Sequence, residues 1–225
     1  MKLTLDVENT VTKRDGKVHM DPFEPNNTLV MVGVLTDQDV CYAFPFDHTG
    51  HESGFDYSDR VQWFLDQATV LIMHNASHDL MWLWESGFKY DGPVFDTMLA
   101  EYVLQRGDKS KPLSLEACAE RYQLDTKKQD TLKEYFAKGY STRDIPLDEL
   151  SEYCIADIKA TQQLADKQIR RLNSQSDAGL MGTVDLTNQV AVCLARMYQR
   201  GFKVDMSALQ TVQAEFEQER SDLID

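Results

Sequence analysis

The stretch "LTLDVENT", residues 3–10, combines the pattern of a β-strand with two closely spaced acids. Its apolar residues alternate with other residues, which predicts a strand. Asp6 and Glu8 stand two positions apart, so along a strand their side chains point to the same face. Neighbouring carboxylates raise each other's pKa unless a cation lies between them. The stretch is therefore either a solvated strand end or half of a metal site.

The acid pair carries little weight alone, because the chain is rich in acids. Asp and Glu make up 37 of its 225 residues, so acid-x-acid pairs also arise by chance. The choice between a solvated strand end and a metal site depends on what the rest of the sequence places beside these two residues.

Composition indicates a soluble globular protein. Hydrophobic residues make up 42% of the chain and charged residues 27%. The longest apolar run, "VLIM" at 70–73, has the length of a strand and not of a membrane span. Asp6 and Glu8 also interrupt any signal-peptide core. Four cysteines without a CxxC pair predict reduced thiols and a cytosolic location.

The net charge of −14 argues against a protein that grips duplex DNA by itself. Action on nucleic acid would need divalent cations or a further domain to offset the repulsion. Residues 106–143 hold nine bases against six acids. This stretch is the candidate for contact with a phosphate backbone, and a solvated helical surface is an equally good interpretation.

The remaining pattern predicts an α/β fold with a mixed sheet. The three-residue turn "DQD" predicts that the second and third strands form an antiparallel hairpin. Residues 9–27 are polar and punctuated by Gly and Pro, which predicts a long loop or a hairpin. We expect strands at 3–7, 28–36, 39–44, 68–75 and 92–96, helices at 59–67, 77–87, 97–105, 114–124, 130–140 and 146–172, and further helix over 183–225 except at 201–205.

Two further polar pairs fall where a site could form. In "HNASHD", Asn75 and Asp79 are four apart at the junction of a strand and a helix, where α/β sheets bind ligands. In "YCIAD", Tyr153 and Asp157 are four apart on the long helix and share one helix face. An acid in the first turn of a helix, or the polar edge of an amphipathic helix, explains either pair alone.

Taken together, the three pairs form a more specific pattern. They read as DxE on a first strand, NxxxD after a later strand and YxxxD on a late helix, in that order. Four carboxylates and a tyrosine from three elements can hold two divalent cations. The joint pattern therefore favours a metal site over three unrelated polar pairs.

These residues resemble the DEDD superfamily of 3′–5′ exonucleases, in its tyrosine subtype. Asp6 and Glu8 match the first motif, Asp79 the second and Asp157 the third. Tyr153 stands four before Asp157; the histidine subtype would have His five before it, where this chain has Glu152.

The wider resemblance is to the proofreading domain of phage-like family A DNA polymerases. It rests on "VFDTMLAEYVL" at 94–104, "KPLSLEACAERY" at 111–122 and "LARMYQRGFKVDMSAL" at 194–209, the last resembling the entry to a polymerase domain. It assigns no role to residues 13–27.

The resemblance implies a ribonuclease H-like fold, with a mixed five-stranded sheet, helices on both faces and a helical C-terminal extension. It implies a 3′–5′ exonuclease domain at 1–175 and the truncated helical start of a polymerase domain at 176–225. The end at "QERSDLID" continues a helical pattern, so we expect a fragment end. We also expect a monomer, located in the cytoplasm (the host cytoplasm if phage-encoded).

The resemblance also implies hydrolysis with two metal ions, Mg²⁺ with Mn²⁺ as a substitute. One ion would be held by Asp6, Glu8 and Asp157, and the other by Asp6 and, through water, Asp79. Tyr153 would orient the attacking water. Asn75 and the backbone near Asn9 and Thr10 would hold the terminal nucleotide of a single-stranded DNA 3′ end. The products would be nucleoside 5′-monophosphates.

Three alternatives stay open. A free-standing ribonuclease D-like exonuclease that trims RNA would lack the "RGFKVD" continuation at 200–205. A non-catalytic scaffold would have lost a carboxylate, whereas all four are present. A structural metal-binding module would show no chelator-sensitive nuclease activity.

Overall fold

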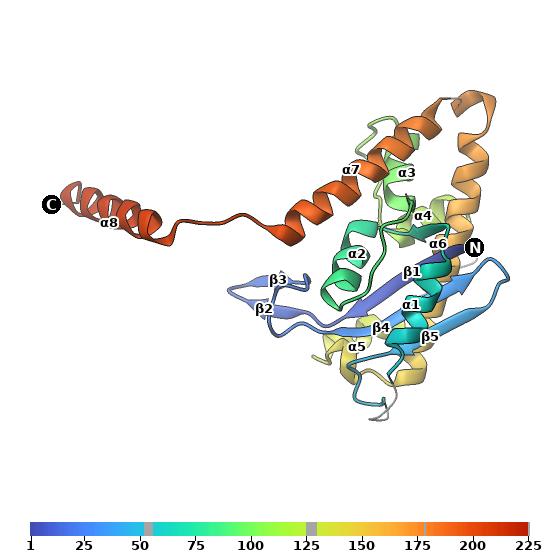
Figure 1. The fold of residues 1–225 in the computed structure, drawn as a ribbon, viewed down its shortest axis with the longest axis horizontal. Helices are drawn as coiled ribbons and strands as arrows, with labels where there is room; N and C mark the ends of the chain where they lie inside the picture. The colour runs from blue at the N-terminus through green and yellow to red at the C-terminus, as the bar shows by residue number, and fades with distance from the viewer. Residues whose placement is uncertain (52–55, 125–129, 178, 225) are drawn as a thin grey trace.

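A five-stranded mixed sheet forms the centre of the molecule in the computed structural model, which describes residues 1–51, 56–124, 130–177 and 179–224 (Figure 1). The strand order is β5-β4-β1-β6-β7. The strands are β1 (Lys2–Asn9), β4 (Leu29–Thr36), β5 (Cys41–Pro45), β6 (Val70–Met73) and β7 (Val94–Asp96).

Strand directions follow the predicted hairpin and the predicted strand–helix alternation. β1 pairs antiparallel with β4, and β4 antiparallel with β5, which confirms the hairpin around "DQD". β6 and β7 run parallel to β1. The predicted strands at 68–75 and 92–96 are shorter in the structure, because their outer residues form the turns that lead to the neighbouring helices.

Helices cover both faces of the sheet, as predicted. One face of β1, carrying Leu3, Leu5 and Val7, packs against α1 and α2. The other face, carrying Thr4, Asp6 and Glu8, lies under the long helix α6. The helices are α1 (Ser58–Gln67), α2 (Ala76–Glu85), α3 (Thr97–Leu104), α4 (Leu115–Arg121), α5 (Asp130–Ala137), α6 (Leu147–Leu172), α7 (Leu180–Arg200) and α8 (Met206–Asp222), with short 3₁₀ turns at Thr142–Asp144 and Gln175–Asp177.

The helix α6 sits close to the sheet because β4 carries a glycine beneath it. A Cβ at Gly33 would overlap the Cys154 sulfur and press on Ile158. Gly33 is the antiparallel partner of Asp6. The absence of a side chain at this position therefore lets α6 approach the carboxylate face of β1.

The segment between β1 and β4 contains a small hairpin of β2 (Thr12–Arg14) and β3 (Lys17–His19). Its two-residue turn, Asp15–Gly16, has positive φ at both positions, as a type I′ turn requires. Of the two structures expected for residues 9–27, the hairpin is therefore the one observed.

The two C-terminal helices relate differently to the sheet. α7 packs on α2, α3 and the edge strand β7, burying Val184, Asn188 and Ala195. Residues 201–224, which include α8, are exposed throughout and extend away from the sheet (Figure 1). None of the helices in the described residues is long and apolar enough to span a bilayer.

Candidate active site

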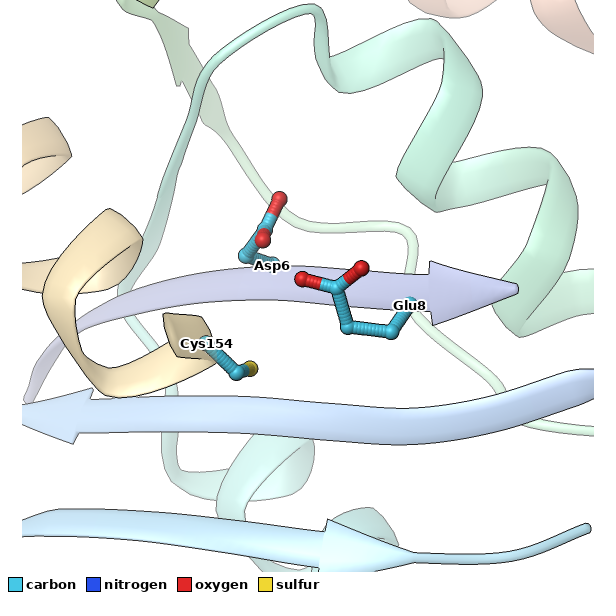
Figure 2. A group of neighbouring side chains, drawn as sticks. All are labelled: Asp6, Glu8 and Cys154. Carbon is cyan, nitrogen blue, oxygen red and sulfur yellow. The ribbon is translucent and has the colours of Figure 1, made fainter. Parts of the chain in front are cut away.

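Two carboxylate side chains project from β1 on the face that packs against α6. The strand alternation that buries Leu5 and Val7 on one face places Asp6 and Glu8 together on the other. Figure 2 shows both side chains on β1, with Cys154 reaching toward the strands from α6. One potential ligand atom from each of these three residues lies within 4.8 Å of the other two. The expected pairing of the two acids on one strand face is present.

Asp79 joins this pair from the first turn of α2. Its side chain is only 2% exposed, and the nearby main-chain amide of Val7 partly offsets the rise of its pKa. Its Oδ2 is buried and finds no hydrogen-bond partner among the described residues. A buried carboxylate oxygen without a partner is costly, so this atom is available to a cation or to ordered water.

Asp96 holds the strand–helix junction from which Asp79 projects. Its carboxylate caps α3 by accepting from the amides of Met98 and Leu99, and it also accepts from those of Asn75 and Ala76 at 3.1 and 2.8 Å. One buried acid thus satisfies the amino-terminal ends of two helices. Sequence reasoning missed this role. An Asp directly before the predicted helix at 97–105 was the available signal.

Tyr153 and Asp157 come from successive turns of α6 and line the same groove as Asp6 and Glu8. Burial is the first cause that raises the pKa of Tyr153, followed by the negative charge of Asp157. A hydrogen bond to Asp157 contributes in the same direction. Tyr153 therefore keeps its hydroxyl proton at neutral pH, directly beside a carboxylate.

The cluster is electrostatically unfavourable without a cation. Burial, and then the charge of Asp157, raise the pKa of Asp6 to about 8. Burial also raises the pKa of Glu8 and of Asp79, with the charge of Asp6 as the next cause for both. Neither Asp6, Glu8 nor Asp79 forms an ion pair with any residue that the structure describes. Together with the unpartnered Asp79 oxygen, this set of oxygen ligands fits a hard divalent cation.

Cys154 belongs to the packing of α6. It is fully buried beside Val30, Met31 and Leu150. Burial, and then the charge of Glu8, raise the pKa of its thiol well above the ordinary value. A metal ligand would have to be a thiolate, so this raised pKa favours a packing role.

A groove of about 650 Å³ contains four of the five predicted catalytic residues: Asp6, Glu8, Tyr153 and Asp157. Asn9 lies in the same groove, and its side chain is already fully engaged. His78 Nε2 lies 2.9 Å from Asn9 Oδ1, while Asn9 Nδ2 donates to the carbonyl of Thr10. Desolvation lowers the pKa of His78, which keeps the ring neutral. His78 also lines the groove, and sequence reasoning did not identify it.

Two of the predicted nucleotide-binding residues lie outside the groove lining. Thr10 is buried, its amide donates to Thr28 O at 3.0 Å, and its hydroxyl accepts from the Thr28 amide at 2.8 Å. Asn75 is exposed in a left-handed conformation at the start of α2. A substrate-binding role for either residue stays a prediction.

Much of the basic stretch at 106–143 is engaged in ion pairs within the chain. Two of its nine bases, Lys127 and Lys128, lie outside the described residues. Five of the nine bases pair with nearby acids, namely Arg106 with Asp177, Lys111 with Asp108, Arg121 with Glu101, Lys133 with Glu116 and Arg143 with Asp47. For these five bases, the structure favours ion pairing within the protein over contact with a phosphate backbone.

The sequence is similar to a known family of nucleases and to two bacterial DNA polymerases. Residues 25–173 match the model of a family described as 3′–5′ exonuclease, of the DNA polymerase A type. The chain is 30% identical over 141 residues to DNA polymerase I of Synechocystis sp., and 26% identical over 209 residues to DNA polymerase I of Chloroflexus aurantiacus. These matches cover 63% and 87% of the chain, and only 14% and 21% of the two relatives.

Solved structures show the same fold at low sequence identity. NrnC from Brucella melitensis with bound Mg²⁺ superposes with a TM-score of 0.60 at 17% identity, covering 91% of this chain and 89% of that one. The POL domain of Pol1 from M. smegmatis, in complex with DNA primer-template and dNTP, superposes with a TM-score of 0.63 at 18% identity, covering 98% of this chain and 32% of that one. The predicted α/β sheet with helices on both faces and a helical C-terminal region is confirmed.

Proposed function

Because this chain belongs to the 3′–5′ exonuclease family, we propose that it removes nucleoside 5′-monophosphates one at a time from the 3′ end of single-stranded DNA. We further propose that it does so as the proofreading part of a DNA polymerase. The main support is the carboxylate cluster of Asp6, Glu8 and the buried Asp79, which no described base neutralises and which adjoins an open groove.

The cluster is suited to two Mg²⁺ ions, with Mn²⁺ as a substitute, held by Asp6, Glu8, Asp79 and Asp157. When bound, such ions would stabilise charge on the attacking and the leaving oxygen of an in-line displacement. The carboxylates would hold them only in the ionised form. Since burial raises the pKa of Asp6 and Glu8, protons compete with metal at this site.

Tyr153 would position the attacking water by a hydrogen bond. Its hydroxyl stays protonated because burial and the neighbouring Asp157 raise its pKa. Asn9, held by His78, would form the rigid floor of the groove where the terminal nucleotide lies. Contacts of that nucleotide with Asn75 and with the backbone near Thr10 complete the proposed site.

The polymerase context rests on the relatives and on the C-terminal helices. Both curated relatives are DNA polymerase I, and the match to the second covers 87% of this chain. The apolar residues Leu186, Leu194 and Met197 on α7 are 63%, 56% and 63% exposed, as expected of a surface that packs on a further domain. We propose that 1–175 forms the exonuclease domain and that 176–225 begins the polymerase domain of a monomeric cytoplasmic enzyme.

The second candidate is a free-standing exonuclease of the ribonuclease D-like type. It is favoured by the match to the NrnC structure, of which this chain covers 89%. Relative rates on DNA and RNA 3′ ends would separate the two candidates.

The proposed function is tested with 3′-labelled single-stranded DNA, mismatched duplex and RNA of one sequence, each with Mg²⁺, Mn²⁺ or EDTA. We expect 5′-mononucleotides from single-stranded DNA with either metal and none with EDTA. Asp6→Ala should abolish digestion, whereas Asp59→Ala, which removes an exposed acid on α1, should not. Digestion in EDTA, or no digestion of any substrate, would contradict the proposal.

A further inference from the structure

The β2–β3 hairpin has two chemically different faces. On the rear face, Thr12 Oγ1 donates to Asn27 Oδ1 at 2.9 Å, and Arg14 forms a 3.2 Å ion pair with Glu24. The Glu24 side chain is only 4% exposed. The rear face is thus attached to the segment that returns toward β4.

That returning segment is itself held in place. Asn27 Nδ2 donates to the carbonyls of His19 and Asp21, both at 3.0 Å. The indole of Trp82, on α2, donates to the carbonyl of Met20 at 3.1 Å. These hydrogen bonds connect the hairpin to the folded core, so the position of its front face is set by the core and not by a free loop.

The front face looks into the groove that contains Asp6 and Glu8. Lys13 and Val18 are cross-strand partners, and both line that groove together with Val11 and Met20. Val11, Val18 and Met20 are 41%, 55% and 51% exposed. Phe136, on α5, and Tyr140, after it, line the same groove and are 44% and 48% exposed. Exposed apolar side chains from two separate segments of the chain therefore line the groove.

Lys13 is the one lysine or arginine among the described residues that line this groove. It makes no ion pair with any part of the chain that the structure describes. A lone cation in a groove with apolar walls and an acidic end complements a single strand of nucleic acid, whose phosphates are charged and whose bases have apolar faces.

Lys13 lies on β2, which continues beyond the end of β1, the strand that carries Asp6 and Glu8 (Figure 1). It follows Glu8 by five residues. A phosphate at Lys13 would belong to a nucleotide upstream of the terminal one.

We propose that the front face of the β2–β3 hairpin is a binding subsite for the nucleotides upstream of the 3′-terminal one, with Lys13 contacting a backbone phosphate. This proposal rests on the proposed exonuclease function. Val18 and Met20 support the bases of these upstream nucleotides. The hairpin makes the enzyme favour a strand several nucleotides long over a minimal substrate.

The test compares two substrates for the full chain with Mg²⁺: a single-stranded hexanucleotide, and the p-nitrophenyl ester of thymidine 5′-monophosphate, which has no upstream nucleotide. We expect Lys13→Ala to raise the KM for the hexanucleotide by about 5- to 10-fold, the loss of one charge-assisted phosphate contact. The kcat for the hexanucleotide and both constants for the ester should stay at parent values.

Lys17→Ala is the matched control. Lys17 is the cross-strand partner of Arg14, so its side chain lies on the rear face of the hairpin, opposite to Lys13. It removes the same charge and should leave the KM for the hexanucleotide unchanged. The slope of log KM against log salt should fall by about 0.7 in Lys13→Ala alone.

The outcomes separate this proposal from the exonuclease itself. Equal KM values for the parent and Lys13→Ala, or equal effects of Lys13→Ala and Lys17→Ala, would overturn the hairpin subsite while leaving the exonuclease intact. If the parent protein hydrolyses neither the hexanucleotide nor the ester, the proposed exonuclease function itself is wrong.

Discussion

At the scale of single residues, Asp6 links the metal site to folding stability. Its pKa is about 8 in the folded protein without metal, against an ordinary value of 3.8. Between these values the unfolded chain has released a proton that the folded chain still holds. Raising the pH therefore favours unfolding over this range. The stabilising contribution is complete below about pH 4 and is lost as the pH rises toward 8.

We expect the Tm of the metal-free protein to fall between about pH 5 and pH 8, and Asp6→Asn to reduce this fall. At pH 8 the variant should be more stable than the parent by roughly 1–3 kcal/mol, because it removes a partly desolvated charge that lies near Asp157. Glu8 and Asp79 should retain part of the pH dependence, since burial raises their pKa values too. Thermal unfolding in EDTA measures the effect, and the same pH slope in both proteins would contradict it.

Tyr153 offers a second test at this scale, because its proposed role depends on one hydroxyl group. Tyr153→Phe keeps the ring and removes that hydroxyl. We expect a loss of roughly 10²-fold in kcat, or about 3 kcal/mol, with metal affinity by calorimetry near that of the parent. Tyr140→Phe is the control, since Tyr140 also lines this groove and the change removes the same group. Equal turnover by Tyr153→Phe and the parent would reduce Tyr153 to a packing residue.

At the scale of elements, the contact between α6 and β4 sets the position of two proposed catalytic residues. Gly33→Ala places a methyl group against the Cys154 sulfur. We expect it to lower the free energy of unfolding by about 1–3 kcal/mol through overpacking. Turnover should also fall, because α6 carries Tyr153 and Asp157.

A double-mutant cycle measures this contact. Cys154→Ala should recover at least about 0.5 kcal/mol in the Gly33→Ala background, because the two positions share one space. Gly182→Ala serves as the control, since an added Cβ at this helical position meets nothing within 4 Å. Purely additive effects of Gly33→Ala and Cys154→Ala would show that the close approach of α6 does not depend on this pair.

At the scale of the whole molecule, α7 and α8 contribute unequally to the folded unit. α7 buries Val184 and Ala195, and its Asn188 Nδ2 donates to the carbonyl of Val94 at 3.1 Å. Residues 201–224 remain exposed throughout. We expect a chain ending at Arg200 to keep the parent Tm and the parent nuclease rate.

Val184→Ala in the full chain should instead cost about 1–3 kcal/mol, because it opens space in the core beside Ile72 and Phe95. Calorimetry on both proteins checks the contrast. A large loss of Tm on removing residues 201–225 would show that α8 packs on the rest of the chain.

The local structure of this protein could be read from short stretches of its sequence. Alternation in residues 3–10 predicted β1 and the common face of Asp6 and Glu8, and periodicity predicted α6 and the shared face of Tyr153 and Asp157. Such patterns involve residues a few positions apart, and the backbone repeat alone decides which of them share a face.

Only the tertiary structure decided which distant residues meet. It brought Asp79 to the amide of Val7, made Asp96 a cap for two helices, and turned Lys13 rather than Lys17 toward the groove. No local repeat encodes these contacts, because each depends on how packed elements are placed relative to one another. The sequence thus determined the elements and the kinds of side chain they carry. The packing around Gly33, Asn27 and Asp96 decided where those side chains converge.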